Sequence, residues 1–121
     1  MKRKIKFRGR CNGTWRKGDH LTYETGDCIK QWSGMISPEY SVESDTVGQF
    51  TGAYDCDGNE IYEGDILQHR DAPAGYLEVF YHKNFCAFAV RKPVQPLMKD
   101  TVANYRVIGN IHDNPEFLKG E

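Results

Sequence analysis

Polar and apolar residues alternate with a period of two along much of this chain, and turn residues interrupt the alternation at short intervals. Between Lys4 and Arg8 the basic residues occupy every second position, so they project from one side of an extended strand while Ile5 and Phe7 project from the other. The same alternation recurs over residues 76–82. Short strands separated by Gly, Asn and Asp predict a mainly β protein.

The alternation and the turn signals together predict the order of the elements. We expect further strands over residues 47–51, 59–62, 66–69, 76–82, 85–91 and 105–111. Asn12-Gly13 predicts a hairpin turn, Lys17-Gly18-Asp19 is a second candidate turn, and Asp57-Gly58 predicts a type I′ turn. Asn114-Pro115 predicts the start of a short C-terminal helix, because proline is well accommodated at the first helical position.

Residues 24–46 contain glycines, serines and Pro38 without a sustained period. We interpret them as a long irregular loop with a short strand around 29–32, following an N-terminal strand and hairpin at 1–23. Residues 47–121 then predict a small SH3-like or partly open β-barrel that ends in the short helix. A chain of 121 residues has the length of one domain, so we expect 1–121 to form a single domain.

Composition places the chain among intracellular globular proteins. The mean hydropathy is -0.68, and no apolar run approaches the roughly 18 residues that suggest a membrane span. The basic N-terminus is followed by polar sequence without the apolar segment of a signal peptide. The four cysteines, at 11, 28, 56 and 86, form no CxxC pair, and we expect them to be reduced in a cytoplasmic protein.

The net charge of -1 conceals an uneven distribution of charge. Residues 1–30 hold nine Lys or Arg and three Asp or Glu, whereas residues 31–69 hold eight Asp or Glu and no Lys or Arg. Such a chain either pairs its own charges in the fold or presents two different faces to two partners.

The basic N-terminal strand is the best candidate for a binding site. Lys2, Lys4, Lys6, Arg8 and Arg10 are expected on one side of a strand with a spacing of roughly 6.6 Å, similar to the spacing of phosphates along a nucleic-acid strand. Trp15 and Arg16 follow closely and could add stacking contacts. The alternative is a solvated face, or one that pairs with the acidic segment that follows it in the sequence.

The remaining chemistry-bearing residues give weaker signals. The carboxylates of Asp55, Asp57, Glu60, Glu63 and Asp65 could hold a divalent cation, but their spacing does not match a calcium-binding loop, and turn formation explains them more simply. The four histidines show no catalytic spacing, and Cys86 in NFCAFAV is expected as a small core residue. We therefore predict no catalytic residues, no metal site and no cofactor.

Three blocks of sequence carry a family resemblance: IKFRGR at 5–10, QFTG at 49–52 continuing through DGNEIYEGDIL at 57–67, and RVIGNIHDNPEFL at 106–118. Together they resemble the YopX family of phage, prophage and mobile-element proteins. They occur in the family's order and span the chain. The resemblance implies a mostly β fold, a bacterial cytoplasmic setting and a mobile-element origin, and it implies no assigned reaction.

These observations favour a non-enzymatic binding module without a membrane partner. The preferred ligand is nucleic acid, held by Lys4, Lys6, Arg8 and Arg10, with Trp15 and Arg16 as secondary contacts. The alternative is an assembly or host-directed inhibitor module that binds a phage or host protein through residues 24–45 and the acidic middle segment, and self-association is expected with it. A small metal-dependent hydrolase that uses the carboxylates near Asp57 is the least favoured interpretation.

Overall fold

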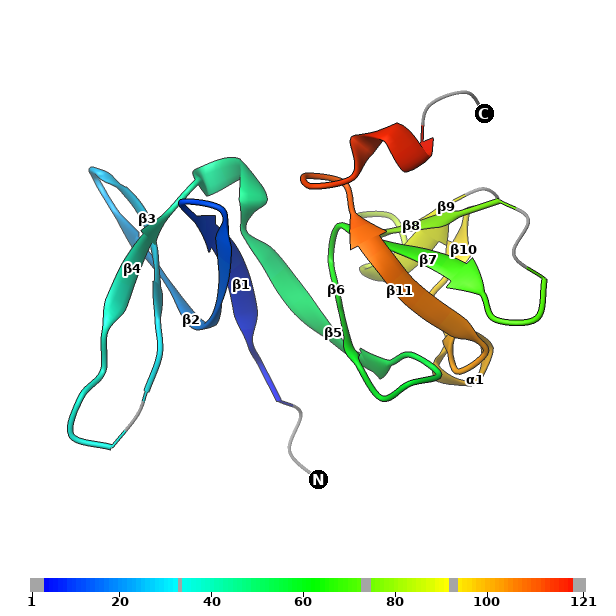
Figure 1. Ribbon diagram of the computed structural model, residues 1–121, viewed down its shortest axis with the longest axis horizontal. Helices are drawn as coiled ribbons and strands as arrows, with labels where there is room; N and C mark the ends of the chain where they lie inside the picture. The colour runs from blue at the N-terminus through cyan, green and yellow to red at the C-terminus, as the bar shows by residue number, and fades with distance from the viewer. Residues whose placement is uncertain (1–3, 33, 73–74, 92–93, 119–121) are drawn as a thin grey trace. The chain divides into compact units, whose positions relative to one another are not determined.

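The computed structural model describes residues 4–32, 34–72, 75–91 and 94–118. The chain divides into two compact units, Met1–Phe50 and Thr51–Glu121, called here the first and the second unit. It is mostly β, with two antiparallel sheets that do not close into a barrel (Figure 1). The predicted mainly β class is confirmed, whereas the SH3-like barrel is not. That the whole chain is a single domain stays a prediction.

The first unit contains four strands and the beginning of a fifth. They are β1 (Phe7–Cys11), β2 (Thr14–Tyr23), β3 (Gly26–Lys30), β4 (Glu39–Val42) and the start of β5 (Gly48–Tyr54), with a 3-10 helix, η1 (Ser44–Thr46), before β5. Their order in the sheet is β4-β3-β2-β1-β5 (Figure 1). Asn12 and Gly13 both have positive φ, 50° and 82°, so the predicted hairpin turn is confirmed and is of type I′.

Two predictions for the first unit are wrong. Lys17-Gly18-Asp19 is not a turn, because Lys17 pairs with Arg8 and Asp19 pairs with Lys30 within the continuous strand β2. Residues 24–46 are not one irregular loop, because β3 pairs with β2 on one side and with β4 on the other. The short strand expected around 29–32 overlaps the end of β3, whereas β4 is a run of only four residues, too short for its alternation to stand out.

One side of this sheet packs around buried apolar side chains. Ile29 is fully buried, Val42 is 8% exposed, and Phe7 contacts the ring of His20. A Cβ atom added to Gly9 would lie 2.8 Å from Cγ2 of Val42, so β4 crosses close over β1 at a position that only glycine fits. This packing leaves the opposite side of β1 and β2 for the basic residues.

The second unit contains the rest of β5 and the remaining elements. These are β6 (Glu60–Tyr62), β7 (Asp65–His69), β8 (Leu77–His82), β9 (Ala87–Arg91), β10 (Gln95–Pro96), α1 (Lys99–Val102), β11 (Tyr105–Asn110) and the 3-10 helix η2 (Pro115–Leu118). Five strands form a sheet in the order β10-β9-β8-β7-β11. Its core comprises Ala53, Ile61, Leu67, Leu77, Val79, Val90 and Val102. None of the helices in the described part of the chain is long and apolar enough to cross a membrane.

Most elements of the second unit agree with the prediction, and three details differ. The β8–β9 hairpin and the short helix after Asn114 are confirmed, the latter as a 3-10 helix. At Asp57-Gly58 only Gly58 has positive φ, so the predicted type I′ turn is wrong. Cys86 is exposed because it lies in the hairpin turn with φ of 52°, and its thiol faces the carbonyl of Lys83, so the prediction of a core residue is wrong. Helix α1 was not predicted.

Gly18→Ala is expected to destabilise the first unit by about 1–3 kcal/mol, because a Cβ atom at Gly18 would overlap the carbonyl oxygen of Lys30 on the neighbouring strand. Urea unfolding followed by tryptophan fluorescence measures this unit selectively, since both tryptophans of the chain, Trp15 and Trp32, lie in it. Gly26→Ala is the control, because a Cβ atom there meets nothing within 4 Å. Equal losses for the two variants would contradict the steric explanation.

Candidate functional site

The pairing of β1 with β2 places three of the predicted site residues on one side of the sheet. Residues directly opposite each other in an antiparallel pair share a face, and Arg8 lies opposite Lys17 while Arg10 lies opposite Trp15. Lys6, two residues before Arg8, continues the same side. We call the side that carries Lys6, Arg8, Arg10, Trp15 and Lys17 the basic face.

Cations on the basic face are stacked on aromatic rings. The Arg8 guanidinium lies 4.7 Å and the Arg10 guanidinium 5.9 Å from the centroid of the Trp15 ring. The Lys6 ammonium lies 6.0 Å from the centroid of the Phe50 ring. Such contacts contribute about 0.5–1 kcal/mol at exposed sites. Arg8 is buried, with 8% of its surface exposed, whereas Lys17 is exposed.

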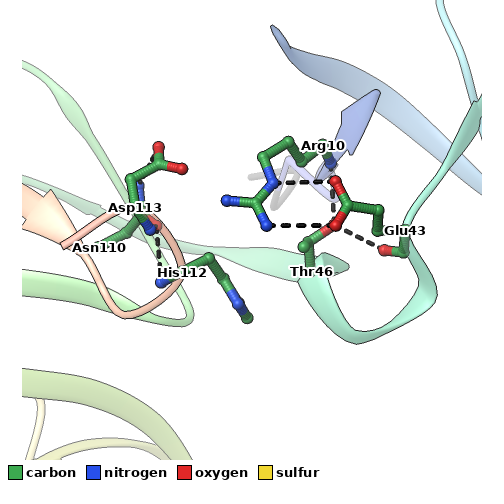
Figure 2. A network of polar contacts seen from close by, with 6 residues as sticks. All are labelled: Arg10, Glu43, Thr46, Asn110, His112 and Asp113. Atoms are coloured by element: carbon green, nitrogen blue, oxygen red, sulfur yellow. Dashed lines mark hydrogen bonds and ion pairs between the residues drawn. The ribbon is translucent and has the colours of Figure 1, made fainter. Parts of the chain in front are cut away.

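Arg10 also fastens the end of β1 to the segment that follows β4, as Figure 2 shows. Its Nε and Nη2 atoms donate to the two carboxylate oxygens of Glu43 at 3.0 and 3.2 Å. Its backbone N–H donates to Oγ1 of Thr46 at 2.9 Å, and the Thr46 hydroxyl donates to the carbonyl of Glu43. The backbone N–H of Glu43 in turn donates to the carbonyl of Arg10. One acidic residue of the middle segment thus pairs with the basic strand, through a two-bonded contact that a phosphate could also make.

The other predicted site residues lie elsewhere. Arg16 projects from the opposite side of β2, and its guanidinium lies 3.9 Å from the centroid of the Tyr40 ring. Lys4 is exposed and precedes β1, while Lys2 is outside the described residues. The structure therefore brings together Lys6, Arg8, Arg10 and Trp15, and it separates Arg16 from them.

A hydrogen-bonded cluster lies on the side of the sheet opposite to the basic face. His20 Nε2 lies 2.8 Å from Oδ1 of Asp27, and the Thr22 hydroxyl donates to the same oxygen. The pKa of the Asp27 carboxyl is lowered, first by a hydrogen bond from the Ser44 hydroxyl and then by His20. This cluster joins neighbouring strands and the η1 segment, so it has a structural role.

Two of the carboxylates that the sequence offers for a metal site, those of Asp55 and Asp57, bind backbone and side-chain donors in the structure. Asp55 is buried, and it accepts the backbone N–H groups of Asp57, Asn59 and Val107 at 2.8–2.9 Å. Burial opposes ionisation of Asp55, but these donors outweigh it and lower the pKa of the carboxyl below its usual value. Asp57 binds Nε of Arg106 at 2.7 Å. Among the described residues no three His, Cys, Asp or Glu side chains gather as metal ligands would.

The loop after β11 is closed by its own side chains. The side-chain oxygen of Asn110 accepts the backbone N–H groups of His112 and Asp113, as Figure 2 shows for His112. The amide nitrogen of Asn110 donates to Asp113, and the backbone N–H of Asn110 donates to Asn114 Oδ1 at 3.3 Å. A Cβ atom on Gly109 would overlap the Asn114 side chain, so glycine is required there. These contacts within the loop fix its conformation.

Comparison with known proteins assigns the chain to a family. The family described as YopX protein matches residues 6–119, which is nearly the whole chain. The chain belongs to the YopX family. The resemblance noted in the sequence is thereby confirmed.

A solved structure from the same comparisons is similar to this YopX-family chain over its full length. It is the crystal structure of protein EF1440 from Enterococcus faecalis, with 26% sequence identity and a TM-score of 0.63. The match covers 96% of this chain and 99% of that chain. None of the curated proteins compared matches the chain. These similarities establish the family and support the fold, and the description of the EF1440 structure names no activity.

Lys30 and Trp32 lie near the basic face but were not among the predicted site residues. Lys30 lies opposite Asp19, so it shares the side of the basic face, and its ammonium lies 4.3 Å from the centroid of the Trp32 ring. Lys30 and Trp32 are two residues apart, a spacing that places both side chains on one side of an extended segment. This could be used only once the bounds and pairing of β3 were known.

Asp55→Asn is expected to destabilise the second unit by about 2 kcal/mol at neutral pH, because the amide cannot accept all the bonds that the carboxylate accepts. Since the folded pKa of Asp55 is lowered, its contribution is present above the unfolded pKa of about 3.9 and is lost as pH falls through the folded value. Urea unfolding followed by circular dichroism at pH 7 and pH 3 should therefore show a smaller difference between variant and native protein at pH 3.

The exposed Asp100 in α1 provides the control for this substitution. Asp100→Asn should leave the unfolding free energy close to the native value at both pH values. A loss for Asp55→Asn that is the same at pH 7 and pH 3 would contradict a role for the ionised carboxylate.

Proposed function

We propose that this YopX-family chain is a non-enzymatic binding module that binds nucleic acid through the basic face. In this proposal the module comes from a phage or prophage and acts in the cytoplasm of the bacterial host. The observation that carries the proposal is the register of β1 and β2, which gathers Arg8, Arg10, Lys17 and Trp15 on one side of the sheet. Lys6, just before β1, adds a fourth cation beside Phe50. Nucleic-acid strands are bound by such combinations of cations and aromatic rings.

In this proposal the residues of the basic face have different roles. Alternate side chains on β1 lie roughly 6.6 Å apart, which suits successive phosphates of one strand. Lys17 is exposed and Lys6 is half-buried, so both ammonium groups suit phosphate contacts, and Lys4 extends the row. Arg8 is buried against Trp15, so its role is to hold that ring in place. Arg16 projects to the other side and has no part in the proposed contact.

In this proposal Glu43 competes with the ligand for the guanidinium of Arg10. Its carboxylate occupies two donors of Arg10 in the geometry that a phosphate would use. A bound phosphate would displace the carboxylate from Arg10, while the backbone bonds between Arg10, Glu43 and Thr46 keep the segment in place.

The second candidate function is a protein-binding assembly or inhibitor module. One observation favours it: Met35 and Ile36, in the connection between β3 and β4, are 104% and 72% exposed. Exposed apolar side chains in a group often mark a protein-binding surface. This segment lies within residues 24–45, where the sequence placed the alternative surface.

Replacement of both Lys6 and Lys17 by Gln is expected to weaken the binding of mixed-sequence oligonucleotides, because two phosphate contacts are lost. In a fluorescence anisotropy titration over a salt series, the slope of log affinity against log salt should decrease in magnitude by about 1.4 for a single strand. The control is the double variant with Gln at Lys83 and Lys99, two exposed lysines of the second unit that give the same change in net charge. Equal slopes for the two variants would contradict the assignment of the basic face.

Glu43→Gln is expected to have the opposite effect. Loss of the carboxylate releases Arg10 for the ligand, and the affinity for oligonucleotides should rise about two- to five-fold, the range expected for an exposed ion pair. Glu116→Gln, at an exposed position of η2, gives the same change in net charge and is the control. If Glu43→Gln binds no more tightly than Glu116→Gln in the same titration, the competition between Glu43 and phosphate does not occur.

A further inference from the structure

The connection between β3 and β4 presents an exposed apolar tip. Trp32 is 67% exposed, Met35 104% and Ile36 72%, and residues 31–38 contain no charged side chain. The tip is closed at its base by a hydrogen bond from the backbone N–H of Gln31 to the carbonyl of Pro38 at 2.9 Å. Large apolar side chains that are exposed together are unusual on a monomer and indicate a contact surface.

Trp32 differs from its two neighbours in the tip because its ring is held in place. The indole N–H donates to a carboxylate oxygen of Asp19 on β2, and the Lys30 ammonium lies 4.3 Å from the ring centroid. The one polar atom of the side chain is thus satisfied while most of the ring surface remains exposed. An aromatic ring fixed before binding loses little conformational entropy when a ligand stacks on it.

The register of the strands places Trp32 at the end of the basic face. Lys30 lies opposite Asp19, and Asp19 is two residues beyond Lys17 on β2, so all three share one side of the sheet. On this side, β1 to β4 and Lys6 contribute five basic residues and two acidic residues, Asp19 and Glu39. The positive charge therefore continues from β1 to β3 and ends beside the Trp32 ring.

We infer that Trp32 is a stacking site for an unpaired base, so that the ligand of the basic face is single-stranded nucleic acid. This inference rests on the proposed function and specifies its ligand. In a duplex the flat faces of the bases are already stacked on each other, whereas a single strand can place a base on an aromatic ring at any sequence. The continuity with the basic face and the cation against the ring favour this ligand over an apolar protein pocket.

The chain contains two tryptophans, so the ring at position 32 can be observed alone in Trp15→Phe. Titration of this variant with oligodeoxythymidine of about 12 nucleotides, a length comparable to the site sizes of single-strand-binding OB-folds, should quench the fluorescence of Trp32. A duplex of the same length should produce little quenching. A labelled oligonucleotide in an anisotropy titration measures binding independently of either tryptophan.

Trp32→Ala should weaken binding of the single strand by about 5- to 150-fold, the range of one base–aromatic stack. The salt dependence should be unchanged because no charge is removed. Trp32→Phe should restore most of the affinity, since it keeps an aromatic face. Met35→Ala and Ile36→Ala are the matched controls in the same tip, and each should change the affinity less than two-fold, about the limit set by a loss of 0.4 kcal/mol.

The possible results separate this inference from the proposed function. If the labelled strand binds but the signal of Trp32 and the affinity of Trp32→Ala do not change, the inference is wrong and the proposed function stands. If neither single strand nor duplex binds at low salt, the proposed function fails and the inference fails with it. If phosphatidylcholine vesicles shift the Trp32 emission to the blue and losses at Met35 and Ile36 equal that at Trp32, the tip contacts lipid and the inference is overturned.

Discussion

The two-residue turn at Asn12-Gly13 sets the register of β1 against β2, and the composition of the basic face depends on that register. Both residues have positive φ, the geometry that joins twisted antiparallel strands most directly. A slip of one residue would move every side chain of one strand to the other side of the sheet. Arg8 and Arg10 would then lose Trp15, and Gly9 would no longer lie beneath Val42. The packed side and the charged side of this sheet are therefore specified together.

Within each unit, acidic residues pair with basic side chains or accept backbone N–H groups. In the first unit Glu43 pairs with Arg10 through two bonds, and Glu39 lies near Lys30 at 3.9 Å. In the second unit Asp57 pairs with Arg106, and Asp55 accepts backbone N–H groups instead of a cation. Self-pairing and binding are not exclusive alternatives, because an exposed ion pair is weak enough for a polyanion to displace. A ligand that bound the basic face would therefore need to break only a weak ion pair at Arg10.

The sequence predicted those features that are determined by neighbouring residues and missed those that are determined by distant ones. The Asn12-Gly13 turn and the β8–β9 hairpin are local, and the structure has both. The strand expected at Lys4–Arg8 is also present, but it begins at Phe7 and runs to Cys11. The pairing of Asp19 with Lys30 and of β3 with β4 depends on partners across the sheet, so Gly18 suggested a turn where its actual role is close approach to a neighbouring strand. Arg16 was grouped with Trp15 by proximity in sequence, although adjacent residues of a strand point to opposite sides.

The blocks that identify the family explain the fold better than they explain a function. In the second and third blocks, Asp55 lies beside a turn that it holds, Asp65 accepts the backbone N–H of Tyr62, and Asn110 closes its own loop. Residues that satisfy backbone groups in turns would be needed by any protein with this architecture, whatever it binds. The ring of Trp32 satisfies no backbone group of a turn in this way. It is mostly exposed and lies between the first two blocks. An exposed aromatic ring held beside a cation contributes little to the stability of the fold, so any ligand specificity of this chain is best sought in the segment between the first two of these blocks.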